Sequence, residues 1–292
     1  EVHQALDVHR RGAAKITLDR VVGVERFADL QNLGVAEVLD AARVVDAQLV
    51  GDVDGGLAAD AVDPSDPTQV DGTGKVQQWN DLSGNSFHAT HVTGTVGAAG
   101  VDFEAKGMAF QATVKTFDWT QDEAEVLGEI QEGLLLSNHS YGTRLLNVPS
   151  WYAGAYSQDA LQWDLIHYVS PYYLMVAAAG NDGNVVNNEP TTEGFDKLTG
   201  HKNGKNNLVV ANAQDAEINS SGNLISVNIN SASSEGPTDD LRIKPDITGN
   251  GTGVYSTNSS GDDNYTTLSG TSMASPNVMG TLLLVQQQEI LF

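Results

Sequence analysis

Strand-like and helix-like segments alternate along most of this chain, and that alternation restricts its fold more than any other feature. Segments that read as strands occur at 44–53, 113–119, 134–138, 173–179 and 207–213; the one at 134–138 is typical of a buried strand and the one at 173–179 is apolar. Helix-like spacing appears at 84–100, at 122–131 and after Ser157, where we expect four apolar residues to face inward: Leu161, Leu165, Ile166 and Val169. This order predicts an α/β fold of three layers, with a mostly parallel central sheet and helices on both faces.

Near the end of the chain, the stretch 268–280 (LSGTSMASPNVMG) places Ser272 at the start of a helix. Pro276 is expected in the first turn, where a missing N–H costs nothing, and apolar residues continue at helical spacing behind it. Free backbone N–H groups and the positive end of the helix dipole gather at such a point and would stabilise an oxyanion. Taken alone, the stretch is explained equally simply as a serine-rich helix cap.

Composition excludes several functional classes. The formal charge of −23 over 292 residues disfavours binding to nucleic acid and to anionic membranes, which both need basic patches. The chain has no cysteine, which excludes disulfides, thiol chemistry and cysteine-based zinc sites. No apolar run approaches 18 residues, so we expect no membrane span.

Residues 1–45 carry much of the basic charge and have near-helical spacing, which predicts an N-terminal helical lead-in or arm before a main domain at 46–292. Asp54, followed by two glycines, comes after the first predicted strand; this is either a functional carboxylate at a strand end or an ordinary Asp-Gly turn. Between Arg43 and Lys75 the chain has no Lys or Arg, and this stretch indicates either a solvated loop or a calcium site. It contains seven aspartates: Asp46, Asp52, Asp54, Asp60, Asp63, Asp66 and Asp71.

Four residues together supply the groups that a serine nucleophile requires. A serine hydroxyl needs a base, and histidine is the base tuned for neutral pH. The histidine needs a carboxylate to hold its tautomer, and the developing oxyanion needs donors aimed at it. These roles map onto Ser272, His88, Asp54 and Asn181. His88 and His91 are three residues apart without a glutamate between them, which argues against a zinc-protease motif.

Chain order separates the serine-hydrolase architectures. No histidine follows Ser272, because the last one is His201, so the α/β-hydrolase order of Ser, acid and His is excluded. The chymotrypsin order belongs to an all-β chain, which the helical segments contradict. The order of Asp, His and Ser along this chain is the one found in subtilisin.

At these motifs the chain resembles the subtilisin-like serine proteases (subtilases). GTSMASP at 270–276 matches the nucleophile segment of the family, and AAAGNDG at 177–183 matches its oxyanion segment. FHATHVTGT at 87–95, SNHSYG at 137–142 and KPDITGNG at 244–251 are similar to the histidine, cleft-strand and Lys-Pro-Asp segments. The resemblance covers residues 45 to 290 and implies a subtilisin-like fold.

The resemblance implies a role for each matching residue. Ser272 would be the nucleophile, His88 the general base and then acid, Asp54 its orienting carboxylate, and Asn181 with the Ser272 backbone N–H the oxyanion hole. The substrate backbone would pair with Ser140, Tyr141 and Gly142. One wall of the primary specificity pocket would be formed by Ala178, Ala179 and Gly180.

Several positions depart from the family pattern. The acid segment reads DVDGGL, so Asp52 is a weaker alternative to Asp54, and Ala89 replaces the usual glycine after the histidine. Few residues follow Ser272, so we expect the peptidase domain to be truncated at its C-terminus. A further hypothesis concerns Asp182, which either makes basic side chains acceptable in the primary pocket or is a solvated turn acid.

The function expected from these features is serine endopeptidase activity through an acyl-enzyme intermediate. The alternatives are a catalytically silent subtilase-like domain that binds peptides or partners, and a calcium-dependent carbohydrate-binding or adhesion module. The chemistry requires no cofactor; structural calcium is expected from the resemblance and the acidic run, with no metal ligands identified. We expect a polypeptide substrate, a monomer, and a secreted, cell-surface or periplasmic bacterial protein.

Overall fold

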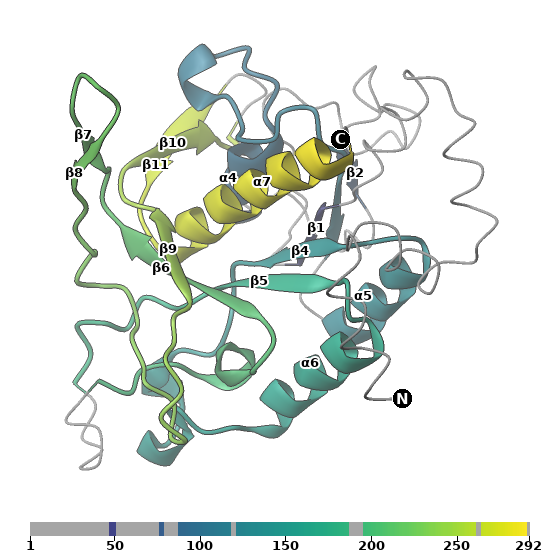
Figure 1. Ribbon diagram of the computed structural model, residues 1–292, viewed down its shortest axis with the longest axis vertical. Coiled ribbons are helices and arrows are strands. Elements are labelled where there is room, and N and C mark those ends of the chain that lie inside the picture. Colours follow the sequence, from purple (N-terminus) through teal and green to yellow (C-terminus); the bar gives the residue numbers. More distant parts are fainter. Residues whose placement is uncertain are drawn as a thin grey trace, which may run out of the picture. The chain divides into compact units, whose positions relative to one another are not determined.

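The computed structural model describes residues 47–50, 76–78, 87–117, 121–186, 195–260 and 264–290. The predicted arm at 1–45 and most of the acidic run therefore lie outside the described residues, as do Asp52 and Asp54. Within the described residues the chain contains a central sheet with helices on either side, as the alternating pattern predicts (Figure 1).

The central sheet has seven strands in the order β2-β3-β1-β4-β5-β6-β9, and all of its pairings are parallel. Its strands are β1 (Ala47–Val50), β2 (Val76–Gln78), β3 (Val114–Phe117), β4 (Leu136–His139), β5 (Leu174–Ala178), β6 (Leu208–Ala213) and β9 (Ile247–Asn250). Five of the seven fall within or overlap the predicted strands. The remaining strands form two antiparallel pairs: β7 (Glu217–Ile218) with β8 (Leu224–Ser226), and β10 (Val254–Thr257) with β11 (Tyr265–Leu268).

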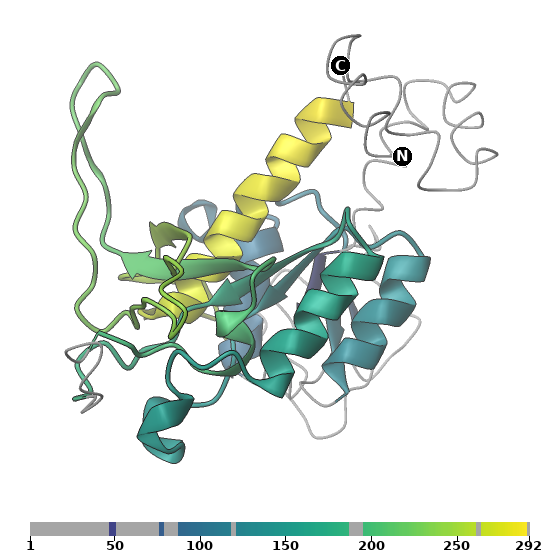
Figure 2. The ribbon, with the colours of Figure 1, turned by 60° about the horizontal axis from the view of Figure 1, so that its bottom comes forward.

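Helices cover both faces of this sheet. The α-helices are α4 (Phe87–Gly97), α5 (Asp122–Gln131), α6 (Gln158–Val169) and α7 (Thr271–Ile290), and short 3-10 turns are η4 (Phe103–Ala105), η5 (Leu145–Asn147), η6 (Ser150–Tyr152) and η7 (Gly200–Asn203). Figure 2 shows α5 and α6 together on one side of the sheet and α7 on the other. The predicted three-layer arrangement is confirmed.

Strand β5 illustrates how alternation produces two cores. Val176 belongs to a cluster with residues of α4 and α7, including Val92, Val96, Met273 and Met279. Its neighbours Met175 and Ala177 belong to a second cluster with residues of α5 and α6, including Val126, Trp163 and Ile166. Because successive side chains of a strand point to opposite faces, an apolar run of this kind requires cover on both sides.

The prediction for the inward face of α6 is wrong at three of its four positions. Ile166 is buried, but Leu161, Leu165 and Val169 are exposed. The buried face instead carries Trp163, Asp164 and His167, among others. The two polar residues are buried because they bond to chain outside the helix: Asp164 accepts the N–H groups of Lys205 and Asn206, and His167 accepts that of Met175. Long-range partners of this kind leave no trace in helical periodicity.

Candidate active site

The candidate site lies at the carboxyl edge of the sheet, where parallel strands end together. Strand β4 ends at His139 and leads into Ser140, and β5 ends at Ala178 and leads into Asn181. These two strands are neighbours, with His139 aligned with Ala177. The segments that follow them are therefore brought side by side, as the resemblance implied.

Ser272 is the second residue of α7 and is joined to Ser140 by two reciprocal hydrogen bonds. Its Oγ donates to the Ser140 carbonyl over 3.1 Å, and Ser140 Oγ donates to the Ser272 carbonyl over 3.0 Å. The second bond has a local cause in Pro276, which has no N–H for the carbonyl four residues earlier. Pro276 lies in the second turn of α7 rather than the predicted first, so the freed carbonyl needs another donor, and Ser140 supplies it.

Two buried polar residues extend this junction into the core. Ser275 Oγ donates to Asn138 Oδ1 over 2.6 Å, and Asn138 Nδ2 donates to Ser140 Oγ over 2.9 Å. Asn138 is on β4 and Ser275 is on α7, and both are at most 1% exposed. The start of the helix is thus fixed to the end of the strand through side chains whose hydrogen bonds are satisfied inside the protein.

Asn181 is held with its carbonyl oxygen toward α7. Its Oδ1 accepts the backbone N–H of Thr271 at 2.9 Å and the Thr271 hydroxyl at 3.1 Å, while the Gly180 N–H donates to the same hydroxyl oxygen at 3.0 Å. With the oxygen committed, the Nδ2 group donates no hydrogen bond within the described residues and keeps its hydrogens for another acceptor. The backbone N–H of Ser272 at the second helix position has no acceptor within the helix.

His88 lies on the first turn of α4, as predicted, and is half-buried. Helix α4 packs against α7, the helix that carries Ser272. In a parallel sheet, a helix that connects two strands begins at the carboxyl edge. Helix α4 lies between β2 and β3 in the chain, so His88 is at the same edge of the sheet as Ser140 and Asn181. Ala89, where the family has glycine, is buried in α4 without breaking the helix.

The other histidine of this segment has a structural role. His91 is fully buried, and its Nε2 lies 3.1 Å from the Val254 carbonyl and 3.2 Å from the Thr266 carbonyl. Burial lowers the pKa of His91 to about 4, so the ring is neutral at pH 7 and its Nε2 donates to β10 and β11. No group of three or more His, Asp or Glu side chains that could hold a metal occurs among the described residues.

A cavity of about 330 Å³ opens beside Ser272 and Asn181. Five of the six residues predicted to contact substrate line it: Ser140, Tyr141, Gly142, Ala178 and Gly180. The side chain of Ala179, directly after β5, does not line the cavity: it is fully buried and packs with Leu198 and Val209. Neighbouring residues of an extended chain point in opposite directions, so Ala178 and Ala179 face different surroundings.

Three charged residues also line this cavity: Arg144, Asp182 and Lys202. Asp182 is neither a solvated turn acid nor a free anion, because it is 4% exposed and accepts the Leu145 N–H at 2.8 Å and Arg144 at 3.4 Å. Lys202 and Arg144 were missed by the sequence analysis. Lys202 lies in a polar segment without a motif and Arg144 lies just after the SNHSYG segment, and only the fold brings the two to one cavity.

Tyr141 connects the cavity wall to a buried polar chain. Its hydroxyl donates to Asp122 at the start of α5 and lies 2.8 Å from His139 Nδ1, and His139 Nε2 lies 2.6 Å from Ser137 Oγ. Burial holds the pKa of His139 well below its usual range and raises that of Asp122 to about 7. The Tyr141 side chain is thereby turned toward the core, which leaves its backbone for contact with a bound peptide.

The chain matches the Subtilase family over residues 38–290 and therefore belongs to it. It is similar in structure to the prenylagaramide maturation protease PagA, with a TM-score of 0.57, 20% identity and coverage of 88% of this chain and 81% of that one. It is also similar to Sphericase, with a TM-score of 0.52, 22% identity and coverage of 84% and 78%. No curated protein matches.

The Subtilase family is a family of serine peptidases, and its substrates are polypeptides. Among the described residues, none of the helices is both long and apolar enough to cross a bilayer.

Proposed function

We propose that the protein is a serine endopeptidase that hydrolyses peptide bonds through an acyl-enzyme intermediate. The observation that carries the proposal is the placement of Ser272 at the N-terminus of α7, beside Asn181 and at the mouth of the cavity. There an alcohol, a side-chain amide donor and a backbone N–H belong to residues that line one cavity. This is the set of groups that acyl transfer requires.

In the proposed reaction, Ser272 Oγ attacks the carbonyl carbon of the scissile bond while His88 takes the hydroxyl proton. The developing oxyanion accepts hydrogen bonds from Asn181 Nδ2 and from the Ser272 N–H. Collapse of this intermediate breaks the C–N bond, and the leaving amine takes the proton from His88. Water then attacks the ester with the same base, and Ser272 is released. Asp54 orients the imidazole in this scheme, and the chemistry needs no cofactor.

The hydrogen bond from Ser272 Oγ to the Ser140 carbonyl gives this scheme a specific requirement. A hydroxyl that donates to a carbonyl cannot donate to the imidazole at the same time, so its rotamer must change before the proton is transferred. The Ser140 carbonyl would then be free to pair with the backbone N–H of an incoming peptide. Substrate binding along Ser140, Tyr141 and Gly142 as an added strand would thus release the nucleophile.

The alternative is a catalytically silent subtilase-like domain that binds peptides in the same cavity. The observation that favours it is the segment DVDGGL, which departs from the family pattern at the position of the orienting carboxylate. Such a domain would keep the cavity and the peptide-binding edge without proton transfer. We further propose a monomer that acts outside the cytoplasm, in keeping with the acidic composition and the absence of cysteine.

Casein cleavage by the purified protein separates these two functions. We expect cleavage by the wild-type chain, and loss of at least about 10³-fold in rate with Ser272→Ala, because the triad acts as a unit. Ser260→Ala, at an exposed position in the loop after β10, serves as the matched control and should retain full activity. A folded wild-type protein that leaves casein intact but binds peptides would favour the silent domain.

A further inference from the structure

The primary pocket contains a buried cation. Lys202, in η7, is 4% exposed and lines the cavity beside Ser272. A methyl group placed on Gly142 would lie 2.9 Å from Lys202 Nζ, and one placed on Gly180 would lie 3.2 Å from it. Gly142 follows β4 and Gly180 follows β5, so the ammonium group lies between the two walls that would hold the side chain of the substrate.

This ammonium group has few partners. Among the residues that the structure describes, its one hydrogen bond, to Thr199 Oγ1, is long at 3.4 Å. Within the described part of the chain no carboxylate lies within 4.0 Å of it, although Asp182 and Asp159 are near enough to favour its charged form. Since an ammonium group has three donors, Lys202 retains capacity for an incoming acceptor.

The two nearest acids are already engaged. Asp182 accepts from the Leu145 N–H and from Arg144, and Asp159 accepts from the His201 N–H at 2.7 Å. Burial lowers the pKa of Lys202 to about 8, and the charges of Asp182 and Asp159 oppose this shift. The lysine is therefore mostly protonated at pH 7. A buried cation that is only weakly paired gains most from a ligand carboxylate that completes the pair.

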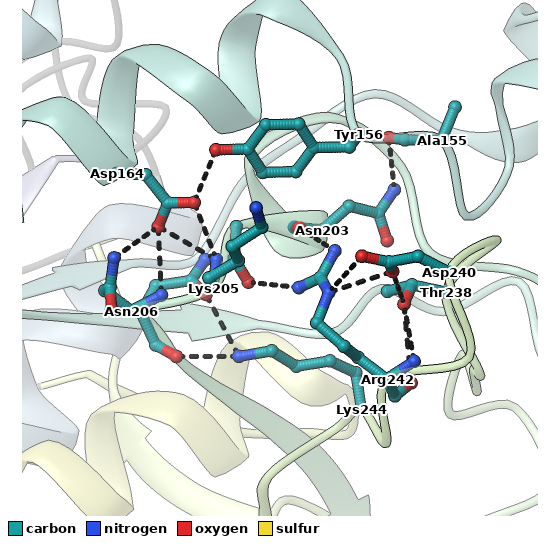
Figure 3. A network of polar contacts seen from close by, with 12 residues as sticks. Ala155, Tyr156, Asp164, Asn203, Lys205, Asn206, Thr238, Asp240, Arg242 and Lys244 are labelled. Atoms are coloured by element: carbon teal, nitrogen blue, oxygen red, sulfur yellow. Dashed lines mark hydrogen bonds and ion pairs between the residues drawn. The ribbon is translucent and has the colours of Figure 1, made fainter.

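The segment that carries Lys202 is held in place from several sides. His201 is anchored to Asp159 of α6, and Asn203 Nδ2 donates to two backbone carbonyls at 3.1 Å. Arg242 donates to the Asn203 carbonyl at 2.9 Å and is held in turn by Asp240, as Figure 3 shows. The backbone on both sides of Lys202 is therefore fixed before any ligand binds, which favours selective recognition.

We propose that Lys202 is a specificity-determining residue that makes the primary pocket select an acidic side chain, glutamate or aspartate, at the residue that donates the scissile carbonyl. This inference rests on the proposed function. It is opposite in sign to the hypothesis that Asp182 admits basic residues. Arg144 at the rim adds a second positive charge, 66% exposed, that favours the approach of an anion.

The test uses tetrapeptide p-nitroanilides that differ only in the last residue: glutamate, glutamine, arginine or alanine. We expect kcat/KM for glutamate to exceed that for glutamine on the order of tenfold, with arginine the poorest substrate. Lys202→Met and Lys202→Gln should bring the ratio of glutamate to glutamine close to one while cleavage of the alanine peptide persists. Lys205→Met, an exposed lysine on the same segment that stacks on Tyr156, should leave the ratio unchanged.

A second measurement separates this inference from the proposed function. Calorimetric titration of Ser272→Ala protein with peptides containing glutamate or glutamine at the same position reports the pocket without catalysis. A preference for the glutamate peptide that disappears in Ser272→Ala, Lys202→Met protein would support the inference even if the wild type cleaved nothing. Equal binding and equal cleavage of the two peptides, or an equal loss of preference in Lys205→Met, would overturn it.

Discussion

Pro276 removes one backbone donor from α7, and the side chain of Ser140 replaces it at the Ser272 carbonyl. This pairing links the helix that carries the proposed nucleophile to the strand expected to bind substrate. Proline beyond the first turn of a helix normally lowers stability, because a carbonyl of the preceding turn loses its donor. Here the hydrogen bond from Ser140 replaces that donor. The pair Ser140 and Pro276 should therefore behave as a coupled unit.

A double-mutant cycle tests this coupling. We expect Ser140→Ala to lower the free energy of unfolding by about 1–3 kcal/mol, because it leaves the partly buried Ser272 carbonyl without a donor. In a Pro276→Ala background the cost should be smaller, since the new N–H at 276 can bond to that carbonyl. Urea denaturation of the four proteins measures both costs. Equal costs in the two backgrounds would show that the residues are independent.

The raised pKa of Asp122 is expected to make the stability of the folded protein depend on pH. Its pKa is about 7 in the folded protein, chiefly because of burial, against an ordinary value of 3.8. The folded state thus binds this proton more tightly than the unfolded state, and the resulting stabilisation, complete below about pH 4, is lost as the pH rises to 7. Asp122→Asn should keep an acceptor for Tyr141 while removing the buried charge.

We therefore expect Asp122→Asn to raise the melting temperature at pH 8 and to change it little at pH 4. Thermal unfolding followed by circular dichroism across this range provides the measurement. Glu132→Gln, an exposed change just beyond the other end of α5, is the control and should show no such trend. A difference between Asp122→Asn and wild type that is the same at all pH values would refute the assignment.

At this scale, sequence reasoning finds residues that carry local motifs and misses those that depend on the fold. Ser272, Asn181 and His88 each occupy a short segment with its own pattern, and the structure gives them the predicted element positions. Lys202 has no such pattern. The fold places its side chain against Gly142 and Gly180, which are far from it along the chain.

Helix α6 shows how elements can be predicted correctly while their orientation is not. Its start at Ser157, whose Oγ accepts the Ala160 N–H, and its end before Pro171 follow from capping and proline chemistry. Its buried face does not follow from apolar spacing, because Asp164 and His167 are buried by bonds to distant backbone. Strand β5 was predictable for the opposite reason, since its run LMVAA is covered on both faces and is apolar throughout.

Two adjacent substitutions test the observed face of α6. Ile166 is 4% exposed and Leu165 is 52% exposed. We expect Ile166→Ala to cost about 2–5 kcal/mol of unfolding free energy through the cavity it leaves, and Leu165→Ala to change stability by roughly 0.5 kcal/mol or less. Both variants lose apolar atoms at neighbouring positions of one helix, so each controls for the other. The reverse order of costs would restore the face predicted from the sequence.

For the whole molecule, the dominant quantity is the net charge of −23. Charge of this size repels itself and favours cations near acidic segments. The acidic run at 46–71 lies almost wholly outside the described residues, so a calcium site there stays a prediction. Within the described residues no metal-binding group occurs, and any calcium ligands are expected in that run.

Calcium binding to the folded state should raise the melting temperature, because a ligand that binds only the native form stabilises it. We expect EDTA to lower the melting temperature by several degrees and added calcium to restore it. Sodium chloride at matched ionic strength is the control, since it screens repulsion without coordinating carboxylates. A melting temperature that does not respond to EDTA, or that sodium restores as well as calcium does, would remove the calcium site.

The central claim is that Ser272 is an activated nucleophile, and reaction with a fluorophosphonate probe tests it most directly. The folded wild-type protein should become labelled, and peptide mapping should place the label on Ser272, with none on Ser272→Ala protein and normal labelling of Ser260→Ala. A folded wild-type protein that stays unlabelled, or that carries the label on another residue, would contradict the claim.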